Sequence, residues 1–239
     1  MTRIVHEEFP ACLANLGDLK FPLIICDPPY GGIVNEYWDY QTVNGYLEIA
    51  KRCSDVLTDG GSLYLWGGIG KPGNRVFFDF LSKVEGETNL TLANLITWKK
   101  RRAYGKKDDY LFTREECAWL VKGKKPAIFN VPYLEEERGY AGFNSKYPAK
   151  SKFKRRANVW TDVTEIFRGK LHPTEKPSRL AEIMIEVHTN PGDWVADFFA
   201  GSGSTGLAAK KLGRNYFLAE KDLAFYNLIQ RRLTDNPEL

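Results

Sequence analysis

The sequence predicts an α/β fold in which a mostly parallel sheet is covered by helices on both faces. Three observations support this prediction. Short apolar runs alternate with segments of helical periodicity, which is the pattern of strand–helix–strand units. An Asp-Pro-Pro-Tyr segment directly follows one apolar run, and a glycine-rich segment lies between another apolar run and a helix. The length of 239 residues suits one such domain with an inserted small module.

The first half of the chain alternates between predicted strands and helices. The apolar run Phe21–Cys26 is a strand that must stop at Asp27-Pro28-Pro29, because proline has no N–H to donate to a sheet. Apolar residues at helical spacing predict a helix from Val43 to Leu57, which Thr58-Asp-Gly-Gly61 ends. The other expected elements here are strands at 62–66 and 92–98, a helix from Asn74 (its cap) to Val84, and a hairpin bracketed by Leu111-Phe112 and Cys117–Val121.

Regular periodicity weakens between residues 99 and 158, so we place the inserted module there and the core at 1–98 and 159–239. Core patterns then return. Helices are expected at 178–188 (started by Pro177 and Ser178), 204–212 and 223–233, with strands at 193–197 and 215–219.

Charge is distributed unevenly along the chain. The stretch from Lys99 to Arg156 holds 17 basic and 7 acidic residues, a balance of +10, whereas the rest of the chain is net negative. A solvated loop could carry such charge, but aromatic rings are interleaved with it. Bases stack on rings and phosphates pair with cations, which favours a nucleic-acid partner. The rings are those of Tyr104, Tyr110, Phe112, Tyr140, Phe143 and Tyr147.

The segment Asp27-Pro28-Pro29-Tyr30 is the strongest chemical signal. The two prolines remove two N–H donors, so that the carboxylate of Asp27 and a bare carbonyl present paired acceptors. Such a pair suits an amino group with two N–H bonds to donate, and the ring of Tyr30 offers a surface on which a planar base can stack. An ordinary Pro-Pro turn is the competing interpretation, but it does not account for this combination at a strand end.

The second signal is the segment from Asp197 to Gly206, which contains Gly201-Ser-Gly203. Glycines allow a tight turn, and the helix that begins near Ser204 directs N–H groups and a positive dipole toward a ligand. About twenty residues later, Glu220 ends the next predicted strand, where an acidic side chain can accept from ribose hydroxyls. The glycine spacing is tighter than G-x-G-x-x-G, which disfavours a nicotinamide fingerprint.

With these motifs in place, the chain resembles the β group of the DNA amino-methyltransferases, which act on N6 of adenine or N4 of cytosine. Asp27-Pro-Pro-Tyr30 is similar to the catalytic motif, Phe199-Ala-Gly-Ser-Gly203 to the cofactor loop, and His172-Pro-Thr-Glu-Lys-Pro177 to a further signature. The resemblance runs from about Ile4 to Phe225. It implies a Rossmann-like fold, S-adenosyl-L-methionine as cofactor, and a target-recognition region at 99–158, the basic stretch.

The resemblance also implies roles for individual residues. The catalytic residues that would hold a flipped target base are Asp27, Pro28, Pro29 and Tyr30. The cofactor-binding residues would be Asp27, Thr174, Lys176, Pro177, Asp197, Phe199, Gly201, Ser202, Gly203, Thr205 and Glu220. Phosphate contacts are expected from Lys99, Lys100, Arg101, Arg102, Lys152, Lys154, Arg155 and Arg156.

Two departures from the family pattern stand out. The chain has Asp197-Phe198-Phe199 where the family commonly has Asp-Pro-Phe, which changes the stiffness of the loop entrance. Glu7-Glu8 stands where the family often has Gly-Asp, and either glutamate is a candidate for contact with the adenine ring of the cofactor. We interpret His172 as a residue that fixes a turn rather than as a general base.

The remaining composition narrows the setting. The four cysteines are scattered without a CxxC pair, which indicates reduced thiols of a cytoplasmic protein, and no metal cluster or membrane span is expected. Double-stranded DNA is the expected partner. A homodimer and a restriction-system partner are compatible with the resemblance. An N4-cytosine enzyme, an RNA or protein-glutamine methyltransferase, and an inactive DNA-binding module remain alternatives to an N6-adenine enzyme.

Overall fold

The structure, a computed structural model, describes residues 2–30, 41–68, 75–105, 107–108, 110–137, 151–167 and 169–234. The strands are β1 Thr2–His6, β2 Phe21–Cys26, β3 Leu57–Gly67, β4 Leu90–Tyr104, β5 Phe112–Lys122, β6 Tyr133–Glu137, β7 Phe153–Arg155, β8 Val159–Trp160, β9 Trp194–Asp197 and β10 Asn215–Glu220. The helices are η1 Ala11–Asn15, α1 Val43–Val56, α2 Val76–Glu87, α3 Ser178–His188, α4 Ser204–Lys211 and α5 Leu223–Leu233.

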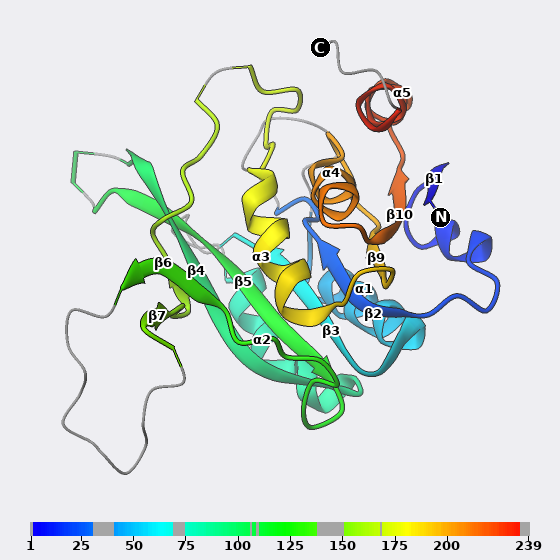
Figure 1. Cartoon of the computed structure of the whole chain (residues 1–239), viewed down its shortest axis with the longest axis horizontal. Helices are drawn as coiled ribbons and strands as arrows, with labels where there is room; N and C mark the ends of the chain where they lie inside the picture. The colour runs from blue at the N-terminus through cyan, green and yellow to red at the C-terminus, as the bar shows by residue number, and fades with distance from the viewer. Residues whose placement is uncertain are drawn as a thin grey trace.

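The main sheet has the strand order β1-β10-β9-β2-β3-β5-β4-β8 (Figure 1). All neighbours pair in parallel except β5, which runs antiparallel to both β3 and β4. The predicted mostly parallel α/β sheet is therefore confirmed. A separate two-stranded antiparallel sheet joins β6 and β7.

Helices cover both faces of this sheet, because side chains of a strand alternate between its two faces. In β2, Ile24 packs in one core cluster with α1 and α2. Its neighbours Leu23 and Ile25 point to the opposite cluster, which α3, α4 and α5 supply. Two apolar layers thus hold β2 at the centre of the sheet and fix the position of the residues that follow it.

The structure corrects the prediction of a hairpin between Leu111-Phe112 and Cys117–Val121. Phe112 and Cys117–Val121 lie in one continuous strand, β5, and its hairpin partner is β4, which extends beyond the predicted end to Tyr104. The polar run Arg114-Glu115-Glu116 lies inside this strand, where Glu115 pairs with Lys176 and Glu116 accepts from Thr97. Part of the basic stretch is therefore built into the core sheet.

Other boundaries differ by a few residues. The helix α1 ends at Val56, and Thr58–Gly61 is an irregularity inside β3, where the register with β2 shifts between Phe21 and Leu23. The first helical residue of α2 is Val76, and the expected cap Asn74 lies outside the described residues, as do Tyr140, Phe143 and Tyr147. No helix in the described ranges is long and apolar enough to cross a membrane.

His188 is buried at the end of α3, and both nitrogens of its neutral ring have hydrogen-bond partners. Its Nδ1 lies 2.9 Å from the carbonyl oxygen of Ile128, and its Nε2 lies 2.9 Å from the hydroxyl of Tyr64. A neutral imidazole can donate from Nδ1 and accept at Nε2. Burial lowers the pKa of His188 to about 4.

We therefore expect NMR titration of the three histidines to find the His188 ring neutral down to about pH 4. The unfolded chain takes up this proton near pH 6.5, so the stability that His188 contributes is present above that pH and is lost as the pH falls toward 4. The difference in unfolding free energy between wild type and His188→Gln should shrink by up to ~1.4 kcal/mol per pH unit over this range. A His188 ring that titrates near 6.5 would contradict the buried neutral state.

Candidate active site

The two motifs lie at the carboxyl ends of neighbouring strands. β2 leads into Asp27, and β9 ends at Asp197; the two strands pair in parallel, with Ile24 opposite Ala196. From β2 the chain continues through α1 to β3, and from β9 it continues through α4 to β10 on the other side. The strand order thus reverses between β2 and β9, which is where open α/β sheets bind ligands.

Asp27 lies in a network of charged and hydroxyl groups. The hydroxyl of Tyr30 donates to Oδ1 of Asp27 over 2.6 Å. The ammonium of Lys176 donates to Oδ2 of Asp27 and, over 2.8 Å, to the hydroxyl of Tyr30. Lys176 also forms an ion pair of 3.1 Å with Glu115 of β5, which is itself paired with Lys100 of β4. The Asp27–Tyr30 segment is therefore tied to residues from three distant parts of the chain.

The electrostatics of this network keep Lys176 and Glu115 charged. Burial lowers the pKa of Lys176, but Asp27 and Glu115 outweigh that effect and the pKa is raised overall. Burial would raise the pKa of Glu115, yet Lys176 and Lys100 hold it at about 2. Burial and the nearby carboxylates raise the pKa of Tyr30, so its hydroxyl stays a donor. The rings of Tyr30 and Trp66 lie 5.1 and 4.9 Å from the Lys176 ammonium.

The glycine-rich loop is fastened to the strands on either side. Gly201 and Gly203 have φ values of 52° and 80°, which a side chain would strain. The N–H of Gly201 donates to Glu220 at the end of β10 over 2.8 Å. Asp197 accepts from the Thr205 hydroxyl over 2.6 Å and from the Phe199 N–H over 2.9 Å, while burial raises its pKa to about 7. Hydrogen bonds to Asp197 and Glu220 therefore fix the loop as a turn at the start of α4.

The His172–Pro177 segment packs against this loop. A Cβ placed on Gly201 would come within 3.7 Å of the His172 ring. Nδ1 of His172 accepts from the Thr174 N–H over 3.2 Å, which agrees with our interpretation of His172 as a residue that fixes a turn. The guanidinium of Arg232 donates to the carboxylate of Glu175 over 2.8 Å and to the backbone carbonyl of Ser202 over 2.9 Å. The predicted cofactor residues thus lie at the ends of β2, β9 and β10, on the glycine-rich loop and the first turn of α4, and on this segment.

The departure Asp197-Phe198-Phe199 is explained by packing. Phe198 is buried among Phe9, Phe21 and Phe217, so its ring anchors the loop entrance in the core. Of the two N-terminal glutamates, Glu8 forms an ion pair of 3.1 Å with Lys221, just beyond β10.

The basic residues predicted to contact phosphate have different surroundings. Lys100 lies in the active-site network, and Arg156 makes a two-bond ion pair with Asp162, at 2.7 Å for each bond. Lys152 and Lys154 pair with Glu137 and Glu136 across the small sheet. The remaining four form no ion pair with another described residue, and their side chains are exposed: Lys99, Arg101, Arg102 and Arg155.

Glu115 is a site residue that the sequence did not single out. The available signal was an adjacent pair of glutamates in an otherwise basic stretch, directly before an apolar run. Nothing in the spacing of the motifs pairs Glu115 with Lys176, because the contact depends on the antiparallel placement of β5.

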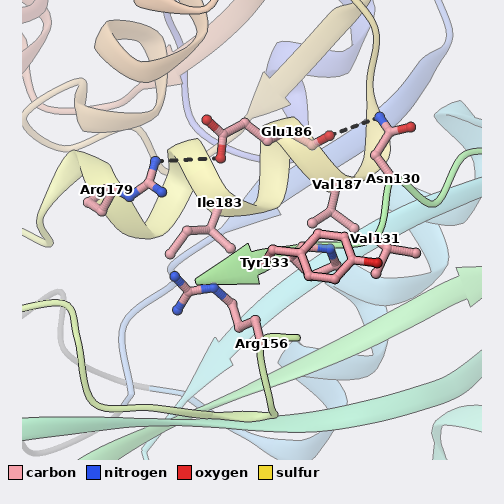
Figure 2. A pocket seen from close by; sticks show the side chains of 9 residues that line it. Asn130, Val131, Tyr133, Arg156, Arg179, Ile183, Glu186 and Val187 are labelled. Carbon is pink, nitrogen blue, oxygen red and sulfur yellow. Dashed lines mark hydrogen bonds and ion pairs between the residues drawn. The ribbon is translucent and has the colours of Figure 1, made fainter. Parts of the chain in front are cut away.

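A separate cavity of about 180 Å³ lies between α3 and residues 130–133 (Figure 2). At the rim of the cavity, Arg179 donates to the carboxylate of Glu186. The side-chain amide of Asn130 donates to the backbone carbonyl of the same residue. None of the predicted catalytic or cofactor residues lines this cavity. The cavity is therefore distinct from the candidate active site.

The proteins that this chain is similar to are DNA methyltransferases, in agreement with the motifs that form the site. A DNA methylase family model (N6_N4_Mtase) matches residues 21–231. The DNA adenine methyltransferase YhdJ of Escherichia coli (strain K12) is 26% identical, covering 96% of this chain and 82% of that protein. The crystal structure of the M1.HpyAVI–SAM complex has a TM-score of 0.66 at 24% identity, covering 98% of this chain and 100% of the other. The cytosine-N4-specific PvuII DNA methyltransferase has a TM-score of 0.71 at 18% identity, covering 100% of this chain and 89% of the other. Because the family model spans nearly the whole core and both motifs, the chain belongs to the N6/N4 DNA methylase family.

Proposed function

We propose that the protein transfers a methyl group from S-adenosyl-L-methionine to N6 of adenine in double-stranded DNA. The observation that carries the proposal is the position of Asp27, whose carboxylate lies at the strand-order reversal beside the glycine-rich loop. Membership of the DNA methylase family and the likeness to an adenine methyltransferase support the choice of reaction and base.

The residues at the two strand ends fit the cofactor. The loop with Gly201 and Gly203 directly precedes the first turn of α4, where the N–H groups of a helix start and its dipole favour an anionic group such as the carboxylate of the cofactor. The carboxylate of Glu220, at the end of the next strand, has the chemistry to accept from ribose hydroxyls. The cofactor supplies a methyl group that its sulfonium already activates, so the protein needs no covalent intermediate.

The remaining task of the protein is to place and polarise the amine. The lone pair of an exocyclic amine is delocalised into the base, and acceptors at Asp27 and the Pro28 carbonyl would draw it toward tetrahedral geometry. The same acceptors stabilise the positive charge that develops on nitrogen. A paired base is out of reach in a duplex, so the target must flip out against the ring of Tyr30.

The region 99–158 is the proposed target-recognition region. Its exposed cations Lys99, Arg101, Arg102 and Arg155 support a role in phosphate contact, since backbone contacts set affinity and register on DNA. The strand β5 inside this region belongs to the core sheet, so recognition falls to the residues on either side of it.

Nucleoside mass spectrometry tests the proposal directly. DNA incubated with the protein and isotopically labelled cofactor should yield labelled N6-methyladenine. Labelled N4-methylcytosine would instead favour the cytosine-N4 specificity of the PvuII enzyme. Label in RNA or protein but not in DNA, or no label at all, would overturn the assignment.

A further inference from the structure

Four charged side chains form one connected cluster in the candidate site. Asp27 contacts Lys176, Lys176 contacts Glu115, and Glu115 contacts Lys100. The Lys176 and Glu115 side chains are only 11% and 18% exposed, so solvent screens them weakly. Two anions and two cations balance, and the removal of any one member would leave a poorly compensated charge.

Both carboxylate oxygens of Asp27 are occupied within the protein. Oδ1 accepts from Tyr30, and Oδ2 accepts from Lys176. A target amine can bond to Asp27 only if one of these donors shares or yields its place. Glu115 is already within 3.1 Å of the Lys176 ammonium and is thus the alternative partner for it.

The reaction makes the charge of Lys176 important. Positive charge passes from the methyl donor to the amine during transfer, and a cation held on Asp27 opposes that charge and weakens Asp27 as an acceptor. A second anion next to Lys176 offsets both effects.

We propose that Glu115 is a positioning residue for methyl transfer, which draws the Lys176 ammonium away from Asp27 so that a carboxylate oxygen can accept from the target amine. The inference rests on the proposed function and extends it to a residue outside both motifs. Lys100 contributes to the same arrangement, because its ammonium balances the charge of Glu115.

The neighbouring Glu116 provides a matched control. Side chains alternate along β5, and Glu116 points to the opposite face, where it accepts from Thr97 over 2.7 Å and pairs with Arg114 at 3.2 Å. Glu115→Gln and Glu116→Gln therefore make the same change of charge and almost no change of shape in adjacent positions, with only the first facing Lys176.

The expected result is a loss of turnover confined to one variant. Glu115→Gln should lower kcat by on the order of tenfold or more, with little change in KM for cofactor or DNA, because substrate and cofactor contacts are intact. Glu115→Asp should retain more turnover than Glu115→Gln, and Glu116→Gln should stay close to wild type. Equal turnover in wild type and Glu115→Gln would overturn the role.

A double variant separates charge from structure. Adding Lys100→Gln to Glu115→Gln restores the balance of one cation against one anion but supplies no partner that draws Lys176 from Asp27, so the melting temperature should recover while kcat stays low. If Glu115→Gln also lowers the melting temperature, this double variant decides, since a merely structural role predicts that turnover recovers together with the melting temperature. Wild-type protein that labels no DNA base would refute the proposed function itself. A labelled base with no effect of Glu115→Gln would refute the positioning role alone.

Discussion

Asp27→Ala is expected to reduce methyl transfer by at least about 10²–10³-fold, because it removes the charged acceptor for the target amine. Groups that act where charge develops in the transition state have effects of this size. Cofactor affinity should change little, since the contacts of the glycine loop, Glu220 and Glu175 do not involve Asp27, and Lys176 keeps its ion pair with Glu115. Single-turnover transfer to DNA and calorimetric titration of the cofactor measure the two quantities separately.

The fold should survive this change. Lys176 keeps Glu115 as a partner, so the ammonium is not left buried without an anion. Asp55→Ala, on the exposed side of α1, is the matched control and should retain full activity. Turnover preserved in Asp27→Ala would reject the proposed role of the carboxylate. Disappearance of both turnover and cofactor binding would assign Asp27 to the cofactor instead.

Replacing Lys99, Arg101 and Arg102 together by glutamine should produce the largest loss of DNA affinity. These side chains are exposed and form no ion pair with another described residue, whereas the N–H groups of Arg101 and Arg102 anchor the strand to Glu165 at 2.9 and 2.6 Å. The substitutions thus remove charge without removing the backbone anchor. The slope of log K against log salt should become shallower by about 0.9 for each phosphate that the variant no longer neutralises.

The paired lysines of the small sheet supply the control for this experiment. Lys152 and Lys154 are engaged with Glu137 and Glu136, so their replacement by glutamine should affect binding less. Fluorescence anisotropy with a DNA duplex over a series of salt concentrations measures both sets. An unchanged slope in the triple variant would place the phosphate contacts elsewhere on the protein.

The fold, and not the composition, determines which of these cations are exposed and which are already paired. Charge counting marked the whole stretch from Lys99 to Arg156 as basic, and it could not separate cations that face solvent from those already paired. Arg156 illustrates the difference: its side chain is 6% exposed and makes a two-bond pair with Asp162. Pairing depends on which strands meet, which local sequence does not record.

Local pattern was sufficient for the core. Helical periodicity and apolar runs located β2, α3 and α5 to within a residue, because each of these elements has one face, or both, buried against a neighbour. Asp-Pro-Pro-Tyr and the glycine loop could also be identified from the sequence, since proline restricts the backbone conformation and glycine widens it wherever they occur. Local pattern did not predict that the polar run in β5 is part of a strand, because its charged side chains are paired with residues far away in the sequence.

The sequence by itself determined the fold class, the two motifs and their order, since all three depend on residues that are adjacent or a few turns apart. Only the tertiary structure decided how Asp27 is held. Lys176 follows it by 149 residues, and Glu115 reaches the same ammonium from an antiparallel strand. Electrostatic attraction acts through space, and in a buried site it selects partners by distance and not by position along the chain.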